Sequence, residues 1–140
     1  MKLELKHLSP YLPYGLKIKY LLTDSIQIEQ VIGLGIDFVL TTEDDYSLES
    51  IKPILRPLSD LDNEVFIESV SDFEFIPCEV FEDHISGWCD AYNEWWNLQY
   101  PNFLQMMDSC PYEVMQQLLE WHFDVFGLID QNLAIDINTI

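Results

Sequence analysis

The chain has 140 residues, of which 49% are apolar and 14% aromatic, and its formal net charge at pH 7 is −19. This length fits one domain over residues 1–140. The apolar content supports a hydrophobic core and excludes the composition of a disordered chain. The charge excludes direct binding to nucleic acid or to an anionic membrane, because phosphate binding requires Lys and Arg.

The charges are unevenly distributed along the chain. Residues 57–140 contain 17 of the 25 Asp and Glu and neither Lys nor Arg, whereas all six bases lie in residues 1–56. A cation-free stretch of this length favours a basic protein as partner, with solubility as the alternative purpose of the charge. An odd number of widely spaced cysteines and the lack of a signal-like or membrane-length apolar run predict a cytoplasmic protein.

The first half has the two-residue period that is typical of strands. A turn-rich segment at 7–15 precedes predicted strands at 16–22, 26–29 and 36–41, and Ile26 and Ile28 alternate with Gln27 and Glu29 in the second of these. The further predictions are an acidic loop at 43–45, an extended segment or sheet edge at 54–56 between two prolines, and a second hairpin from 65–68 and 73–76.

After Pro77 the apolar period becomes that of a helix. Helices are predicted at about 78–98, 102–108 and 111–126, and a final strand at 133–137. Gly127 is a natural C-cap for the last helix. The sequence therefore predicts a single α+β domain, with an antiparallel sheet from the N-terminal half plus a C-terminal strand, packed by two or three aromatic-rich helices.

Several residue patterns suggest chemistry but lack the spacing that the chemistry requires. Cys78, His84, Cys89 and Cys110 lack the closely paired ligands of a zinc site, and buried thiols explain them better. No local signature supports a cysteine nucleophile with His84 or His122, and His122 is interpreted as a core or boundary histidine. We therefore predict no metal, no cofactor and no enzymatic activity.

Three weaker patterns have simpler explanations. The Asp60–Glu64 segment begins like a calcium loop, but Val65 and Ser71 stand where an EF-hand needs Gly and Glu. Gly33 and Gly35 lack the third glycine of a dinucleotide site. The aromatic residues between 88 and 100 lack the neighbouring cations of a base-stacking platform, and core packing explains most of them.

Carboxylates spaced along the predicted helices are suited to charge mimicry. Side chains three or four residues apart on a helix stand about 5–6 Å from one another, and duplex DNA carries a negative charge about every 1.7 Å of its axis. Acidic helix stripes could therefore imitate a phosphate row, with exposed aromatic residues as interface anchors. The predicted partner-binding residues are Glu79, Glu82, Asp83, Asp90, Glu94, Trp96, Tyr100, Glu113, Glu120 and Asp124.

Parts of the chain resemble a group of small uncharacterised proteins carried by bacteriophages and prophages. The resemblance lies in Leu8–Lys17, Ile51–Leu61 and Glu120–Ile129 with Leu133–Asn138, which cover about a quarter of the chain. Gln131-Asn132 stands where relatives often carry Lys-Gly. The resemblance itself implies no activity, but a small acidic phage protein is similar in kind to phage inhibitors of host defence, including nucleic-acid-mimicking anti-CRISPR proteins.

The function expected from this combination is that of a phage-encoded inhibitor. It would bind the basic nucleic-acid channel of a host RNA-guided nuclease and block guide or target binding. One alternative is a non-enzymatic phage accessory protein whose acidity serves solubility. A second alternative is a metal-assisted hydrolase that uses clustered carboxylates.

Overall fold

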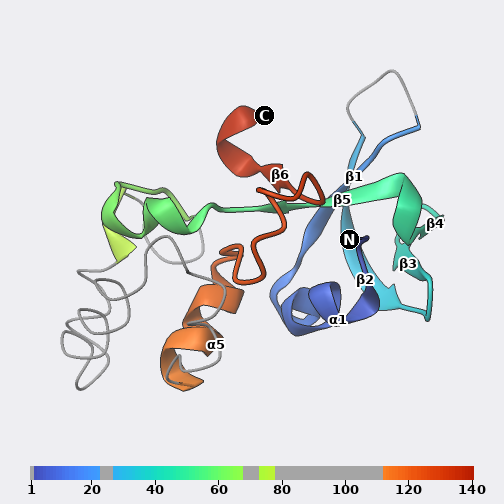
Figure 1. The fold of residues 1–140 in the computed structure, drawn as a ribbon, viewed down its shortest axis with the longest axis horizontal. Coiled ribbons are helices and arrows are strands. Elements are labelled where there is room, and N and C mark those ends of the chain that lie inside the picture. Colours follow the sequence, from blue (N-terminus) through green and yellow to red (C-terminus); the bar gives the residue numbers. More distant parts are fainter. Residues whose placement is uncertain (1, 23–26, 68–72, 78–111) are drawn as a thin grey trace.

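The computed structural model describes residues 2–22, 27–67, 73–77 and 112–140 (Figure 1). Its strands form a six-stranded sheet in the order β4-β3-β2-β1-β5-β6. The bounds of these strands are β1 Lys17–Tyr20, β2 Ile28–Leu34, β3 Phe38–Thr41, β4 Asp45–Ser47, β5 Ile51–Leu55 and β6 Ile135–Asp136. The α-helices are α1 Leu5–Leu8 and α5 Tyr112–Glu120, and the 3-10 helices are η1 Ser9–Tyr14, η2 Leu48–Ser50, η3 Leu58–Asp62 and η5 Ile137–Thr139.

The predicted mixed α+β class is confirmed, and the sheet contains an antiparallel meander as predicted. The bounds of its strands differ: β2 runs over 28–34 where 26–29 was predicted, and β4 was not predicted as a strand. The four pairings among β1 to β5 are antiparallel. The C-terminal strand β6 also joins the sheet, but it has only two residues and runs parallel to β5. The expected acidic loop at 43–45 is the turn that leads into β4, and the turn-rich segment at 7–15 is largely the 3-10 helix η1.

Pro53 lies inside β5, which is an inner strand. Of the two alternatives predicted for 54–56, the extended segment is thus confirmed and the sheet edge is wrong. The amide of Leu21 donates to the carbonyl of Ser50, 2.9 Å away. Since hydrogen-bonded pairs alternate along an antiparallel ladder, Lys19 and Lys52 form the next such pair. Pro53 then faces Ile18 in a non-hydrogen-bonded pair, so its missing N–H removes no bond to β1.

The sheet buries one of its faces. Ile18 in β1, Val31 in β2 and Val39 in β3 are almost fully buried, and α1, η1, α5 and the segment after α5 supply the other side of the core (Figure 1). Leu8, Tyr11, Leu118, Phe123 and Leu128 are its main contributions from outside the sheet.

The helical prediction is confirmed only in part, because α5 forms within the predicted range 111–126 but is shorter than expected. The helix expected at 111–126 ends at Glu120, because His122 adopts a left-handed φ of 61° and the chain leaves the helix axis. Gly127 does have a positive φ of 68°, but in a later turn. The helices expected at 78–98 and 102–108 lie outside the described residues, so the two or three aromatic-rich helices are not borne out. None of the helices in the described residues has the length and apolar composition needed to cross a membrane.

The second predicted hairpin is reduced to one bridge. Val65 and Phe75 pair in antiparallel fashion and exchange two backbone hydrogen bonds of 2.8 and 2.9 Å. The two residues belong to the ranges 65–68 and 73–76 that were predicted to pair, and residues 68–72 lie outside the described part.

The segment after α5, where further helical turns were predicted, instead pairs with the chain just beyond β5. The amide of Arg56 donates to the carbonyl of His122 at 2.7 Å, and the amide of Asp124 donates to the carbonyl of Arg56 at 2.8 Å. Tyr11 closes this junction from the opposite end of the chain, since its buried hydroxyl donates to the carbonyl of Phe123 and accepts from the amide of Val125.

The Tyr11 hydroxyl should stabilise this junction measurably. In Tyr11→Phe, the carbonyl of Phe123 and the amide of Val125 would lose the hydroxyl but keep the bond of 3.0 Å that joins them to one another, and the free energy of unfolding should fall by about 1 kcal/mol. Denaturant unfolding would measure the change. Tyr14→Phe is the matched control, because no described residue bonds the Tyr14 hydroxyl, and a loss as large as that of Tyr11→Phe would contradict the assignment.

Candidate functional site

Exposed carboxylates gather at the turn between β3 and β4. Glu43, Asp44 and Asp45 are consecutive and exposed, and Thr41 holds the turn. The Thr41 hydroxyl accepts hydrogen bonds from the amides of Glu43 and Asp44, both at 3.2 Å, and the Thr41 amide donates to the carbonyl of Asp44 at 2.9 Å. These bonds order the turn, and the Asp44 carboxylate also accepts from the amide of Asp45 at 2.8 Å. All three residues nevertheless stay exposed, so their carboxylates are accessible to a partner.

A fourth carboxylate, that of Glu29 in β2, lies beside this turn. One of its oxygens accepts from the Thr41 hydroxyl at 2.7 Å, and the other accepts from the Tyr46 hydroxyl at 2.5 Å and from Gln27 Nε2 at 2.6 Å. The Tyr46 ring in turn packs against the ring of Tyr20, with centroids 4.6 Å apart. We call Glu29, Glu43, Asp44 and Asp45 the hairpin acidic group.

The hydrogen bonds keep Glu29 charged. Partial burial tends to raise the pKa of Glu29, but the hydrogen bonds from Thr41, Tyr46 and Gln27 outweigh it, and the pKa is lowered overall. The bond to Glu29 is the main reason that the pKa of Tyr46 rises to about 12. All three donors are neutral, so the negative charge of Glu29 is not compensated and adds to that of Asp44.

This arrangement suits the binding of cations on another molecule. A persistent carboxylate beside an acidic turn attracts ammonium and guanidinium groups. Among the described residues there is no group of three His, Cys, Asp or Glu that could hold a metal ion.

A second acidic region surrounds the only arginine. Arg56 is 8% exposed, and its guanidinium lies over the ring of Phe123, 5.9 Å from the centroid. Burial lowers the pKa of Arg56, against the opposing effect of the charges of Asp60 and Asp136. Its buried Nε has no hydrogen-bond partner, and no ion pair of Arg56 occurs among the described residues. The arginine is thus withdrawn from the surface, where the carboxylates remain.

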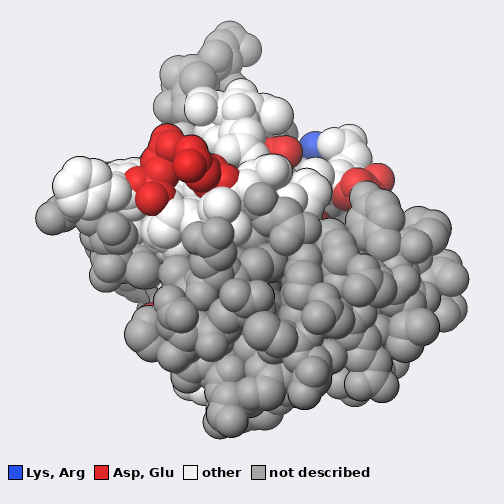
Figure 2. Space-filling model, turned by 90° about the vertical axis from the view of Figure 1, so that its left-hand side faces the viewer, with Lys and Arg blue, Asp and Glu red and all other residues white. Residues whose placement is uncertain are grey.

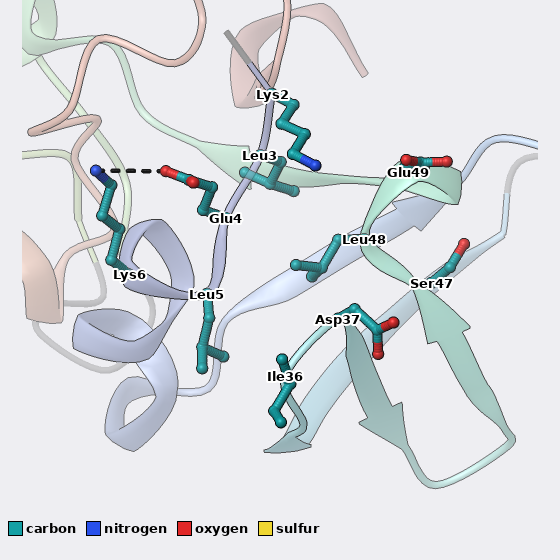
Figure 3. A pocket seen from close by; sticks show the side chains of 10 residues that line it. All are labelled: Lys2, Leu3, Glu4, Leu5, Lys6, Ile36, Asp37, Ser47, Leu48 and Glu49. Carbon is teal, nitrogen blue, oxygen red and sulfur yellow. Dashed lines mark ion pairs between the residues drawn. The ribbon is translucent and has the colours of Figure 1, made fainter.

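An open pocket of about 700 Å³ lies between the N-terminal segment and the sheet (Figure 3). Leucine and isoleucine side chains line its apolar part, and Lys6 pairs with Glu4 at 3.3 Å on its rim. Its charged groups alternate in sign and do not converge on one point, so the pocket offers no catalytic arrangement. The lining residues are Lys2, Leu3, Glu4, Leu5, Lys6, Ile36, Asp37, Ser47, Leu48 and Glu49.

The structure places few of the predicted partner-binding residues. Glu120 is exposed at the end of α5, and the backbone of Glu113 lies in the first turn of this helix. Asp124 was predicted on an exposed helical stripe, but it is only 5% exposed. The residues outside the described part are Glu79, Glu82, Asp83, Asp90, Glu94, Trp96 and Tyr100, together with Cys78, His84, Cys89 and Cys110 of the rejected zinc site.

Asp124 has a structural role instead. Its two carboxylate oxygens accept from the amides of Leu128 at 2.8 Å and Ile129 at 2.9 Å. Burial raises the pKa of Asp124, and these two bonds only partly offset that effect. Because α5 ends before Asp124, its carboxylate turns inward to bond the chain that follows.

Sequence reasoning did not identify the hairpin acidic group as a site. Glu43, Asp44 and Asp45 were visible as an acidic loop, but Glu29 was interpreted only as a polar strand residue. The signal that could have found it is the pairing of β2 with β3, which brings Glu29 near Thr41. Figure 2 shows the side of the molecule away from β3 and β4, where the Asp and Glu side chains of described residues form one larger group and smaller separate ones, and Lys and Arg contribute little of the visible described surface.

Comparisons with protein-family models, with curated proteins and with solved structures give no match for this chain.

The hydrogen bonds of Glu29 can be tested by titration. We expect carbon-detected NMR to give a pKa for Glu29 below the ordinary value of 4.5, and Tyr46→Phe should raise it because one donor is lost. Tyr20→Phe is the control, since Tyr20 packs on Tyr46 without bonding Glu29. A Glu29 pKa that does not respond to Tyr46→Phe would contradict the proposed network.

The burial of His122 predicts a pH dependence of stability. Its Nε2 donates to the carbonyl of Tyr14 at 2.6 Å, and burial lowers the pKa of His122 below the ordinary value of 6.5. Below about pH 6.5, His122 is therefore protonated more readily in the unfolded chain than in the folded chain. The folded state loses stability relative to the unfolded state as the pH falls from about 6.5 to the lowered pKa of His122 in the folded chain.

His122→Asn should remove this dependence while keeping the backbone, because Asn tolerates a positive φ. The difference in melting temperature between the parent chain and His122→Asn should change between about pH 7 and pH 5. His7, whose pKa burial also lowers, is present in both chains and cancels in the comparison. A constant difference across this range would exclude the role assigned to His122.

Proposed function

We propose that this chain is a non-enzymatic acidic inhibitor that binds the basic nucleic-acid channel of a host RNA-guided nuclease. It blocks guide or target binding because its carboxylates occupy the positions of phosphates. The observation that carries the proposal is the stretch of 84 residues, 57–140, with 17 acids and no Lys or Arg. This stretch gives the chain a strong attraction to a groove lined with Lys and Arg.

The described residues support the proposal in two ways. The hairpin acidic group extends the negative surface into the N-terminal half, where Glu29 stays ionised and the three turn carboxylates are exposed. In addition, Arg56 is only 8% exposed, so it presents no accessible guanidinium to a basic partner, although its charge still acts on Asp60 and Asp136. Both features favour a partner that presents several cations at once.

The phage origin in this proposal comes from the resemblance of three sequence blocks, and the kind of partner comes from the charge. A cytoplasmic location in the bacterial host follows from the same proposal. The alternative function is that of a phage accessory protein, which would be equally acidic but would not inhibit a nuclease. The two functions are distinguished by whether the protein reduces the binding of guide or target to the nuclease.

The proposal predicts salt-dependent inhibition. Added to a purified RNA-guided nuclease from the host, the protein should reduce the binding of a fluorescent guide or target, as measured by polarisation. Raising the salt from about 0.05 M to about 0.5 M should weaken the inhibition by roughly tenfold or more, because the screening length shortens. Inhibition that ignores salt, or no inhibition, would contradict charge mimicry.

A pair of isosteric variants separates local contact from total charge. Glu43→Gln, Asp44→Asn and Asp45→Asn together remove three charges from the hairpin acidic group. The matched control is the combination of Glu4→Gln, Asp37→Asn and Glu49→Gln, which removes three exposed charges around the pocket. A larger loss of inhibition from the hairpin variant is expected, and equal losses would mean that this group makes no specific contact.

A further inference from the structure

The outer face of the sheet has the opposite character to the rest of the chain. Alternation along the strands turns residues away from the buried side chains of Ile18, Val31 and Pro53. The outward residues of β1, β2 and β5 that remain accessible and carry side chains are Lys, Ile and Gln. Ile54 of β5 also points to this side but is only 5% exposed, and the nearest acid on this side in the strand pairing is Asp45 of β4, opposite Leu40. We define the lysine–isoleucine face as Lys17, Lys19, Ile28, Gln30, Ile32 and Lys52.

Large aliphatic side chains are exposed on this face. Ile32 is 58% exposed and Ile28 is 41% exposed, and Leu40 of the neighbouring strand β3 is 39% exposed. Single exposed aliphatic residues are ordinary, but a group on one sheet face is typical of an interaction surface. Ile28 faces Lys19 in the register of β1 and β2, so apolar and cationic groups adjoin one another.

The lysines of this face lie together without carboxylates. Lys19 is directly opposite Lys52, a like-charge pair that by itself destabilises a sheet, and Lys17 points to the same side two residues away. Within the described residues, none of the three forms an ion pair, and the Lys52 ammonium bonds the neutral side-chain oxygen of Asn132 at 2.9 Å. The chain has 25 acids and only six bases, yet three of these bases share one sheet face, where their mutual repulsion does not stabilise the fold.

We propose that the lysine–isoleucine face docks a polypeptide segment of a partner protein that carries aliphatic side chains bordered by carboxylates. The aliphatic groups would cover Ile28 and Ile32, and the carboxylates would pair with the lysines. Three adjacent strands are about 10 Å wide, which matches the diameter of one α-helix. One amphipathic helix laid along the strands would thus fill the face.

Charge and shape favour this occupant over other anionic ones. A nucleic acid has no aliphatic groups to cover the isoleucines, and this face has no aromatic residue on which bases could stack. An anionic membrane presents an extended plane of negative charge, which would repel a molecule with a net charge of −19. A narrow polypeptide segment lies within the screening length of about 8 Å of the lysines only, so it is attracted by them. This inference does not depend on the proposed inhibitor function.

The test uses the full chain and a synthetic helical probe. The probe is an amphipathic peptide of about 16 residues, whose leucine stripe is bordered by Glu, and the comparison peptide carries Gln in place of every Glu. In amide NMR spectra of the protein, the Glu peptide should shift signals of β1, β2 and β5. The Gln peptide should bind at least roughly tenfold more weakly, since the charge pairs are lost.

Charge-reversal variants locate the contact. Lys17→Glu with Lys19→Glu should weaken binding of the Glu peptide by at least roughly tenfold, and Ile28→Thr with Ile32→Thr should weaken it while preserving strand propensity. Lys2→Glu with Lys6→Glu is the control with the same change in net charge away from this face, and it should have a much smaller effect. Amide spectra would confirm that each variant is folded.

Several outcomes would overturn the proposal. Equal losses from the two lysine pairs would show that only net charge matters, and equal binding of the two peptides would show that the lysines play no part. Concentration-dependent self-association that Ile28→Thr with Ile32→Thr abolishes would assign the face to a second copy of this chain. Tighter binding to vesicles containing phosphatidylserine than to the Glu peptide would assign it to a membrane. Absence of any shift from the Glu peptide would leave the face without the proposed partner.

Discussion

The described fold depends on one backbone junction, where the chain beyond β5 pairs with the segment after α5. Arg56 exchanges backbone bonds with His122 and Asp124, and Tyr11 bonds the carbonyl of Phe123 from the N-terminal helical segment. These contacts join three parts of the chain that are far apart in sequence. They lie within the segments Leu8–Lys17, Ile51–Leu61 and Glu120–Ile129, so these three segments together hold the described fold closed.

The polar side chains at this junction have structural roles. The Tyr11 hydroxyl, the Asp124 carboxylate and the His122 ring each form a hydrogen bond to the backbone. Such residues specify how the chain closes and leave partner recognition to the surface.

The spacing of apolar residues and the composition of the sequence were enough to predict the α+β class, the antiparallel meander and the return of a C-terminal strand. These features follow from the local alternation of apolar and polar residues. Spacing and composition were insufficient for α5, whose apolar pattern continues to Phe126 although the helix ends at Glu120. The tertiary pairing with Arg56 overrides the helical pattern there, and it is invisible in the sequence. The orientation of β2 was also not predictable from the sequence alone, since its apolar residue Ile28 faces outward and its charged residue Glu29 faces inward. Pairing with β1 and the hydrogen bonds from Thr41 and Tyr46 determine this orientation.

The reversed orientation of β2 separates the two kinds of charge in space. Glu29 lies on the core side of the sheet, where it bonds Thr41 and Tyr46, while Ile28 and Ile32 adjoin the lysines on the outer side. The thickness of a sheet with its side chains is on the order of 10 Å, which exceeds the screening length of about 8 Å at physiological ionic strength. The charge of Glu29 is therefore largely screened from the lysines. Asp45 of the acidic turn pairs with Leu40 and so borders the outer side, which places the change of sign within one face of the sheet, between β4 and β1.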